Sequence, residues 1–440
     1  MSPRWQGQCP SCEGWNTMEE VSKVKSDRTL RPTKKKNTPV ALHNIILEPE
    51  EYLPTGLSEF DNVLGKGLVR GAVVLLSGEP GIGKSTLALQ TALHVAALGK
   101  KVLYISAEES VNQIYMRAHR LFRASIPPSL QVYSETNILD IVQAIDSVKP
   151  QLIILDSIQV VSHPEIASIA GSINQVRQCA DELITVIKEK NLYGILIGHI
   201  TKDGSLAGPK VLEHLVDVIL YLEGERTQQY RLLRSFKNRY ASTHDIGIFD
   251  MKPQGMLGIA NPSELFVDEN TLSHPGSVVT GVAEGSRVIL VEIQALVVDS
   301  GYGMGKRTFL GVDSNRANVM IATIEKNLGF KLSSKDIILN IVGGFKTSEP
   351  ALDLGIILAI ISSLQDFALK KRVGVLGEIG LTGEIRAIPH ADKRLLEFDK
   401  MGFCACILPH KNKVSTPSSL TIKPYYVKTL KEALEVFLST

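Results

Sequence analysis

A glycine-rich segment that ends in a lysine and a serine is the first part of the chain whose residue types and spacing could do chemistry. It has the pattern G-x-x-x-x-G-K-S, follows the apolar run Ala72–Leu76 and precedes the helix-like stretch Thr86–Leu98. Its backbone N–H groups can surround phosphate oxygens, Lys84 can contact the β- and γ-phosphates, and the Ser85 hydroxyl can bind Mg²⁺. The sequence therefore predicts a nucleoside triphosphate site. The residues expected to contact the nucleotide are Gly78, Glu79, Pro80, Gly81, Ile82, Gly83, Lys84, Ser85 and Thr86.

Hydrolysis also needs a metal organiser and a group that activates water, and two strand-like runs lead into carboxylates. Val102–Ala107 runs into Glu108, and Leu152–Leu155 runs into Asp156. Asp156 is placed to hold Mg²⁺ through water, and Glu108 to orient or deprotonate the attacking water. Either carboxylate alone could be a solvated turn residue, but both together with the glycine-rich loop favour a catalytic ATPase site.

The composition of the chain is that of a globular protein and limits how it could bind nucleic acid. The chain has 440 residues, of which 44% are hydrophobic and 21% charged, and this is ordinary for a globular protein of two or three domains. The net charge of +2 means that nucleic-acid contacts must come from local basic patches. The five cysteines do not form a disulfide framework, and no secretory segment or membrane span is apparent. We therefore expect a cytoplasmic protein with no membrane partner.

The order of segments predicts how the chain is organised. A basic linker over 21–46 separates a short N-terminal piece, 1–20, from the rest. Apolar strand-like runs alternate with amphipathic segments over 47–265, and this alternation predicts a parallel sheet covered on both faces. A turn-rich passage around Asn261 and Gly276 marks a boundary, after which 266–440 carries new strands.

Several stretches resemble the RecA-type ATPase core and, more narrowly, the bacterial RadA (Sms) family over nearly the whole chain. They are Leu57–Asp61, Ser106–Ser110, Leu155–Gln159, His199–Gly204 and Lys237–Tyr240. Two mild departures are Tyr240, where the family usually has Phe, and Ala107, where it usually has Gly. The resemblance implies an α/β fold, with a RecA-type P-loop ATPase core around a mostly parallel sheet and an α+β Lon protease-like domain after it.

Two cations one residue apart, Lys237 and Arg239, end a β-like run far in sequence from the phosphate loop. The resemblance implies that they reach into the nucleotide site of a neighbouring subunit, so that function requires an oligomer, expected to be a hexameric ring. A solvated basic turn or a phosphate contact to DNA is the alternative.

His199 follows a strand-like run and could sense the γ-phosphate, although a lone histidine beside a strand is more often structural. With the resemblance we favour a sensor that passes the signal to the loop Thr201–Val211. That loop carries Lys202 and Lys210, and Arg177 lies near the start of a preceding helix. Flexible loops with a few cations suit single-stranded DNA binding without sequence readout.

The N-terminal piece contains Cys9 and Cys12, and it resembles the second half of the four-cysteine zinc ribbon of the family. A structural zinc site needs four ligands, and this chain has no upstream pair and no nearby histidine. We expect weak Zn²⁺ binding, unless the ribbon is completed by residues upstream of this start.

The C-terminal third carries a signature between Ile341 and Ile385, and with it the segment 266–440 looks like a Lon protease domain. A Lon-type site needs a serine and a lysine, but Ala351 and Asp392 stand at those positions. We therefore expect a proteolytically inactive scaffold for oligomerisation and DNA binding. Its basic residues could form a DNA-binding face or simply aid solubility. They are Lys306, Arg307, Lys346, Lys371, Arg372, Lys393 and Arg394.

The resemblance implies a DNA-dependent ATPase of homologous recombination and DNA repair that uses ATP and Mg²⁺. It would load on single-stranded DNA and drive branch migration of branched intermediates as a ring-shaped helicase motor, beside RecA. The alternative is an ATP-switched DNA-binding scaffold or RecA mediator without translocation. An ATP-dependent protease is disfavoured by Ala351 and Asp392.

Overall fold

The computed structural model describes residues 51–122, 124–199, 212–224, 230–267, 274–301, 305–369, 372–415 and 420–440. Residues from Glu50 onwards form one compact unit, which contains two large sheets. The predicted zinc-ribbon remnant and linker, with Cys9 and Cys12, lie outside the described residues, as do Lys202 and Lys210.

The first sheet has nine strands in the order β11-β10-β9-β8-β3-β7-β6-β4-β5. All neighbours from β8 to β5 are parallel, whereas β9, β10 and β11 add an antiparallel edge. This confirms the predicted α/β fold with a mostly parallel sheet. The strands are β3 (Val73–Gly78), β4 (Val102–Ser106), β5 (Leu130–Ser134), β6 (Leu152–Asp156), β7 (Tyr193–His199), β8 (Val218–Glu223), β9 (Tyr230–Asn238), β10 (Ile246–Lys252) and β11 (Gly255–Gly258).

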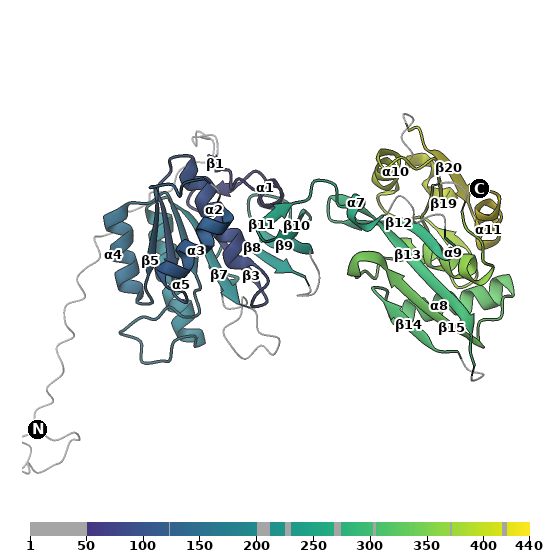
Figure 1. The fold of residues 1–440 in the computed structure, drawn as a ribbon, viewed down its shortest axis with the longest axis horizontal. Coiled ribbons are helices and arrows are strands. Elements are labelled where there is room, and N and C mark those ends of the chain that lie inside the picture. The colour runs from purple at the N-terminus through teal and green to yellow at the C-terminus, as the bar shows by residue number, and fades with distance from the viewer. Residues whose placement is uncertain are drawn as a thin grey trace, which may run out of the picture. The chain divides into compact units, whose positions relative to one another are not determined.

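Helices cover both faces of this sheet, as the long apolar runs of its strands require. The helices α1, α2 and α3 share one buried cluster with the sheet, and α4 and α5 share another cluster on the opposite face (Figure 1). The helices are α1 (Ser58–Leu64), α2 (Lys84–Ala97), α3 (Val111–Leu121), α4 (Ile138–Val148) and α5 (Ile173–Glu189). A short ribbon precedes the sheet, formed by β1 (Tyr52–Leu53) and β2 (Leu68–Val69).

The second sheet is mixed, with seven strands in the order β14-β15-β13-β12-β16-β19-β20. Its strands are β12 (Ser277–Glu284), β13 (Arg287–Asp299), β14 (Arg307–Leu310), β15 (Lys335–Ile341), β16 (Val373–Val375), β19 (Ala405–Pro409) and β20 (Lys423–Val427). The smaller elements around it are α7 (Ser263–Phe266), β17 (Glu378–Ile379) and β18 (Ile385–Arg386), and its helices are α8 (Ser314–Leu328), α9 (Asp353–Leu364), α10 (Ala391–Lys400) and α11 (Leu430–Ser439).

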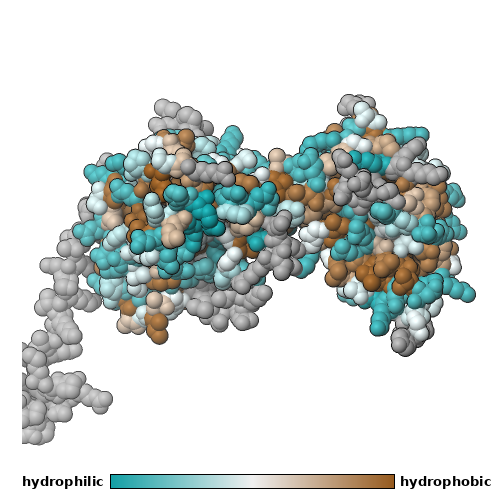
Figure 2. Space-filling model, viewed as in Figure 1, coloured by the Kyte–Doolittle hydropathy of each residue, from teal (hydrophilic) through white to brown (hydrophobic). Residues whose placement is uncertain are grey.

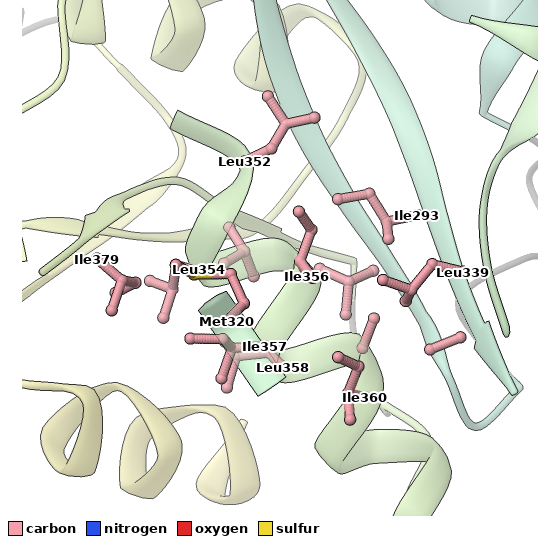
Figure 3. Close-up of a cluster of buried hydrophobic side chains, with 14 of the residues drawn as sticks. Ile293, Met320, Leu339, Leu352, Leu354, Ile356, Ile357, Leu358, Ile360 and Ile379 are labelled. Carbon is pink, nitrogen blue, oxygen red and sulfur yellow. The ribbon is translucent and has the colours of Figure 1, made fainter. Parts of the chain in front are cut away.

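The centre of the second core is α9, which is apolar on all sides and buried. Figure 3 shows Ile356, Ile357 and Ile360 of this helix among Ile293 of β13 and Leu339 of β15. This apolar run is therefore the central buried helix of the second core. Among the described helices, none combines the length and apolar character that a bilayer crossing needs.

The opposite face of the second sheet is only partly covered, because α10 packs over β12 and β13 but not as far as β14. Four apolar side chains stay exposed on β13, β14 and β15, and Figure 2 shows a hydrophobic area over these three strands. They are Leu296, Val298, Leu310 and Ile338.

Candidate functional site

The candidate site lies where the parallel strands of the first sheet end. In the register of the sheet, Gly78 is paired with His199 and Ser106 with Asp156. Because parallel strands end at one edge, the phosphate loop after β3, Glu108 after β4 and Asp156 at the end of β6 come together. Residues more than a hundred positions apart in the sequence therefore share one site.

The phosphate loop needs glycine at two points. Gly78 has a φ of +154°, and a Cβ there would lie 2.4 Å from the carbonyl oxygen of Leu222. Gly83 has a φ of +116° and forms the N-cap of α2, so the first turn of this helix presents its N–H groups to the loop. The backbone of this loop is therefore shaped for close approach to a phosphate.

Lys84 is the buried cation of this loop. Its side chain donates hydrogen bonds from Nζ to the carbonyl oxygens of Gly78 and Glu79, both at 2.9 Å. Only 3% of the residue is exposed, and this burial lowers the pKa of Lys84 to about 8, while the charges of Asp156 and Glu108 act in the opposite direction. The loop thus holds a positive charge among neutral carbonyls, next to two carboxylates.

Asp156 is held by two hydroxyl groups. The Tyr104 hydroxyl donates to Asp156 Oδ2 at 2.7 Å, and the Ser85 side chain also hydrogen-bonds this carboxylate. Burial raises the pKa of Asp156, and the hydrogen bonds from Tyr104 and Ser85 oppose that rise. The donor set of a hydroxyl and a carboxylate fits Mg²⁺, which prefers oxygen ligands and keeps several waters.

Glu108 is bridged to two neighbouring strands. Ser157 donates a hydrogen bond from Oγ to Glu108 Oε1, and His199 Nε2 lies 3.2 Å from the same oxygen. The backbone carbonyl of His199 in turn accepts a hydrogen bond from Gln159 Nε2 at 3.3 Å. The predicted sensor and the predicted water activator are therefore in direct contact. The adjacent carboxylate, Glu109, is instead ion-paired with Arg117 on α3.

Tyr104 and Ser157 were not predicted as site residues. A tyrosine inside the otherwise apolar run Val102–Ile105 was the available signal, because a buried tyrosine hydroxyl usually has a hydrogen-bond partner. The partner is set by the pairing of β4 with β6. This pairing cannot be read from local sequence.

Comparisons with known proteins agree with this geometry. A family model described as an AAA domain matches residues 55–205, and one described as subunit ChlI of Mg-chelatase matches residues 312–412. DNA repair protein RadA of Listeria monocytogenes is 41% identical over 436 residues, covering 99% of this chain and 95% of the relative. The RadA proteins of Bacillus subtilis and Chlamydia pneumoniae are each 42% identical, covering 99% of this chain and 96% of their own lengths.

The chain belongs to the RadA family of DNA repair proteins.

This membership confirms the resemblance found in the sequence. The AAA match contains the phosphate loop, Glu108 and Asp156, so this RadA-family site is one that uses a nucleotide and Mg²⁺. Among solved structures, a KaiC-like protein from Pyrococcus horikoshii OT3 aligns with a TM-score of 0.41 and 18% identity, over 48% of this chain and all of that chain.

Two cations of this RadA-family chain, Lys237 and Arg239, lie at the opposite edge of the sheet from its own phosphate loop. Lys237 is paired with Ile219 near the start of β8, and Ile219 is in turn paired with Leu75 of β3. Leu75 lies three residues before Gly78 on this strand, which is about 10 Å at the usual rise per residue.

The two cations differ in their contacts. Lys237 donates from Nζ to the carbonyl oxygens of Glu213 and Val216, at 2.6 and 2.8 Å. Arg239 is exposed, with Nη1 3.5 Å from Asp217. Of the residues predicted to bind DNA, Arg177 is exposed on α5.

The C-terminal half shows one correction to the sequence analysis. Arg394 was expected on a basic face, but it is fully buried and donates to Glu349 and to the carbonyl oxygen of Pro389. It therefore stabilises the fold and is not available to DNA. Ala351, which the sequence analysis places where a Lon-type site has its serine, is buried in an apolar cluster that also contains Ala391, the neighbour of Asp392.

Proposed function

We propose that this chain is a DNA-dependent ATPase of homologous recombination and DNA repair, which binds single-stranded DNA and drives branch migration as a ring-shaped motor. The observation that carries the proposal is the division of the ATPase groups between two edges of one sheet. Lys84, Glu108 and Asp156 lie at one edge, and Lys237 and Arg239 at the other. We infer that a second copy of the chain brings both groups to one nucleotide.

In this proposal each residue of the first edge has one task. Lys84 and the N–H groups of the loop bind the β- and γ-phosphates of ATP, and Ser85 and Asp156 hold Mg²⁺. The metal, when bound, neutralises charge that develops on the transferred phosphoryl group. Glu108 orients the attacking water and accepts its proton. Lys237 and Arg239 of the next subunit stabilise the same developing charge.

The contact between Glu108 and His199 supports a role for His199 as sensor. A γ-phosphate and its attacking water would compete for Glu108, so the hydrogen bond of 3.2 Å to His199 would change on nucleotide binding. His199 is the last residue of β7, directly before the segment that carries Lys202 and Lys210. Binding and hydrolysis of the nucleotide would thereby change the positions of the proposed DNA-binding residues Arg177, Lys202 and Lys210.

For the C-terminal half, 266–440, we propose a scaffold role without proteolysis. Its support is the buried methyl group of Ala351, which offers no nucleophile. RecA and branched DNA are the proposed partners, and a hexamer is the proposed assembly.

The test is steady-state ATP hydrolysis with and without single-stranded DNA, followed by unwinding of a forked duplex. Lys84→Ala protein serves to subtract contaminating activity. We expect DNA to stimulate turnover, and we expect Lys237→Ala and Arg239→Ala to lose turnover by about 10³-fold without loss of oligomerisation. Turnover that is indifferent to DNA, with no unwinding, would instead favour an ATP-switched scaffold or RecA mediator.

A further inference from the structure

An exposed aromatic residue, Phe236, directly precedes the two cations at the end of β9. The pairing of β8 with β9 shifts at this point, because Ile219 is paired with Lys237 whereas Leu220 is paired with Ser235. Phe236 is therefore the extra residue of a β-bulge. Bulges re-aim side chains, and 61% of this phenylalanine is exposed.

The ring of Phe236 has a defined orientation in spite of its exposure. It contacts the ring of Tyr221 on β8 edge to face, with centroids 5.6 Å apart and planes at 79°. A held aromatic ring loses little conformational entropy on binding, which is why such rings are common interface anchors. The structure thus presents an apolar anchor beside Lys237.

A second exposed apolar surface lies on α3, the helix that begins three residues after Glu108. It is formed on α3 by Val111, Tyr115 and Met116, which are 46%, 59% and 73% exposed, and we call it the α3 patch. The helix begins directly after Glu108 and Glu109, with a capping box between Ser110 and Gln113. The start of the α3 patch, at Val111, is therefore held three residues from Glu108.

We propose that Phe236 of one copy docks on the α3 patch of the next copy and thereby places Lys237 and Arg239 in that copy's phosphate site. The inference rests on the proposed function, because a trans-acting pair of cations is what brings the two surfaces together. The occupant is a second copy of this chain, since the anchor adjoins the cations and the α3 patch adjoins the groups that those cations must reach. The contact would also compete with the hydrogen bonds that Lys237 makes to Glu213 and Val216 in its own chain.

The first test is the dependence of turnover on protein concentration in Phe236→Ala. We expect the concentration that gives half-maximal turnover to rise about tenfold or more, with near-normal turnover at saturation, because the cations remain. Lys237→Ala should stay inactive at every protein concentration. This result separates loss of the Phe236 anchor from loss of a trans-acting cation. Leu139→Ala on α4 is the matched control, because it truncates an exposed apolar residue on the other face of the sheet.

The second test is a double-mutant cycle with Met116→Ala. Each single variant should raise the protein concentration that gives half-maximal turnover, which we call the midpoint. The double variant should raise the midpoint by clearly less than the product of the two single fold-changes. A midpoint in the double variant equal to the product of the two fold-changes would show that the two side chains do not contact each other. A normal concentration dependence in Phe236→Ala would overturn the proposal while leaving the trans-acting cations untouched. Weakened DNA binding at an unchanged midpoint would also overturn it, and would assign Phe236 to DNA.

Discussion

The phosphate site and the second core hold buried charge in opposite ways. In the first sheet, Lys84 is held by backbone carbonyls and Asp156 by hydroxyl groups. In the second, Asp353 is paired with Arg316 through two hydrogen bonds of 2.6 Å. Charges held by neutral groups can still act on a ligand, whereas charges that neutralise each other mainly hold the fold together. The buried charge of Lys84 and Asp156 thus suits a binding site, whereas the pair of Asp353 with Arg316 suits a scaffold.

The largest expected effect of this difference is in the first half. Lys84→Ala should lower ATP turnover by about 10³-fold, because it removes a charge that faces the phosphates. Thermal unfolding should change much less than turnover, since the Lys84 side chain donates only to the neutral carbonyls of Gly78 and Glu79, and Glu79 is exposed. Parallel measurement of turnover and unfolding checks this, and a large loss of stability would break the comparison.

Glu108→Gln should lower turnover by about 10² to 10⁴-fold, because the amide can no longer accept a proton from water. Nucleotide binding should persist, since Lys84 and the loop are unchanged. Equilibrium binding of a fluorescent ATP analogue measures the second property. Glu109→Gln is the matched control, because this neighbouring carboxylate is ion-paired with Arg117, whereas Ser157 and His199 contact Glu108. Equal losses in both variants would contradict the assignment of Glu108.

Arg316→Ala should have the converse effect in the second half. It leaves the fully buried carboxylate of Asp353 without its partner, and we expect a loss of about 3 kcal/mol in stability with normal turnover per folded molecule. Urea denaturation followed by circular dichroism measures the loss. Arg307→Ala, on the exposed edge strand β14, should change stability by less than about 0.5 kcal/mol.

Tyr104→Phe sharpens the comparison because it removes only a neutral donor. The half-saturating Mg²⁺ concentration should rise about tenfold, since a hydrogen bond to a charged group is lost, while turnover at saturating Mg²⁺ stays near normal. Titration of turnover with Mg²⁺ tests this. Tyr133→Phe on β5, whose hydroxyl is 3.4 Å from Glu135, should leave the titration unchanged.

The smallest expected effect is a dependence of ATP affinity on pH. The pKa of Lys84 is lowered to about 8, so its charge is lost as pH rises through that value. Phosphate binding favours the protonated form, so ATP binding takes up a proton above this pH. The Kd for ATP should therefore rise by up to about tenfold per pH unit above about pH 8, and should not change with pH below that value. Lys84→Ala should bind weakly with no such rise, as calorimetry at several pH values would show.

Local sequence patterns were enough to predict much of the candidate site in the first half of the chain. The loop Gly78–Ser85 and the strand ends at Glu108 and Asp156 were predicted from the sequence, because a phosphate loop and parallel strands have local signatures. The C-terminal half was harder to predict. Arg394 looked like a surface residue because it follows Lys393 in a basic pair, yet α10 turns it inwards to Glu349.

The sequence by itself determined where the nucleotide site is expected, because the types and spacing of residues in the phosphate loop suit few other purposes. Only the tertiary structure decided how those groups are supported and shared. The pairing of β4 with β6 brings Tyr104 to Asp156, and the antiparallel return of β9 carries Lys237 to the far edge of the sheet. Both follow from long-range strand order, which depends on the packing of the whole core and on no single segment.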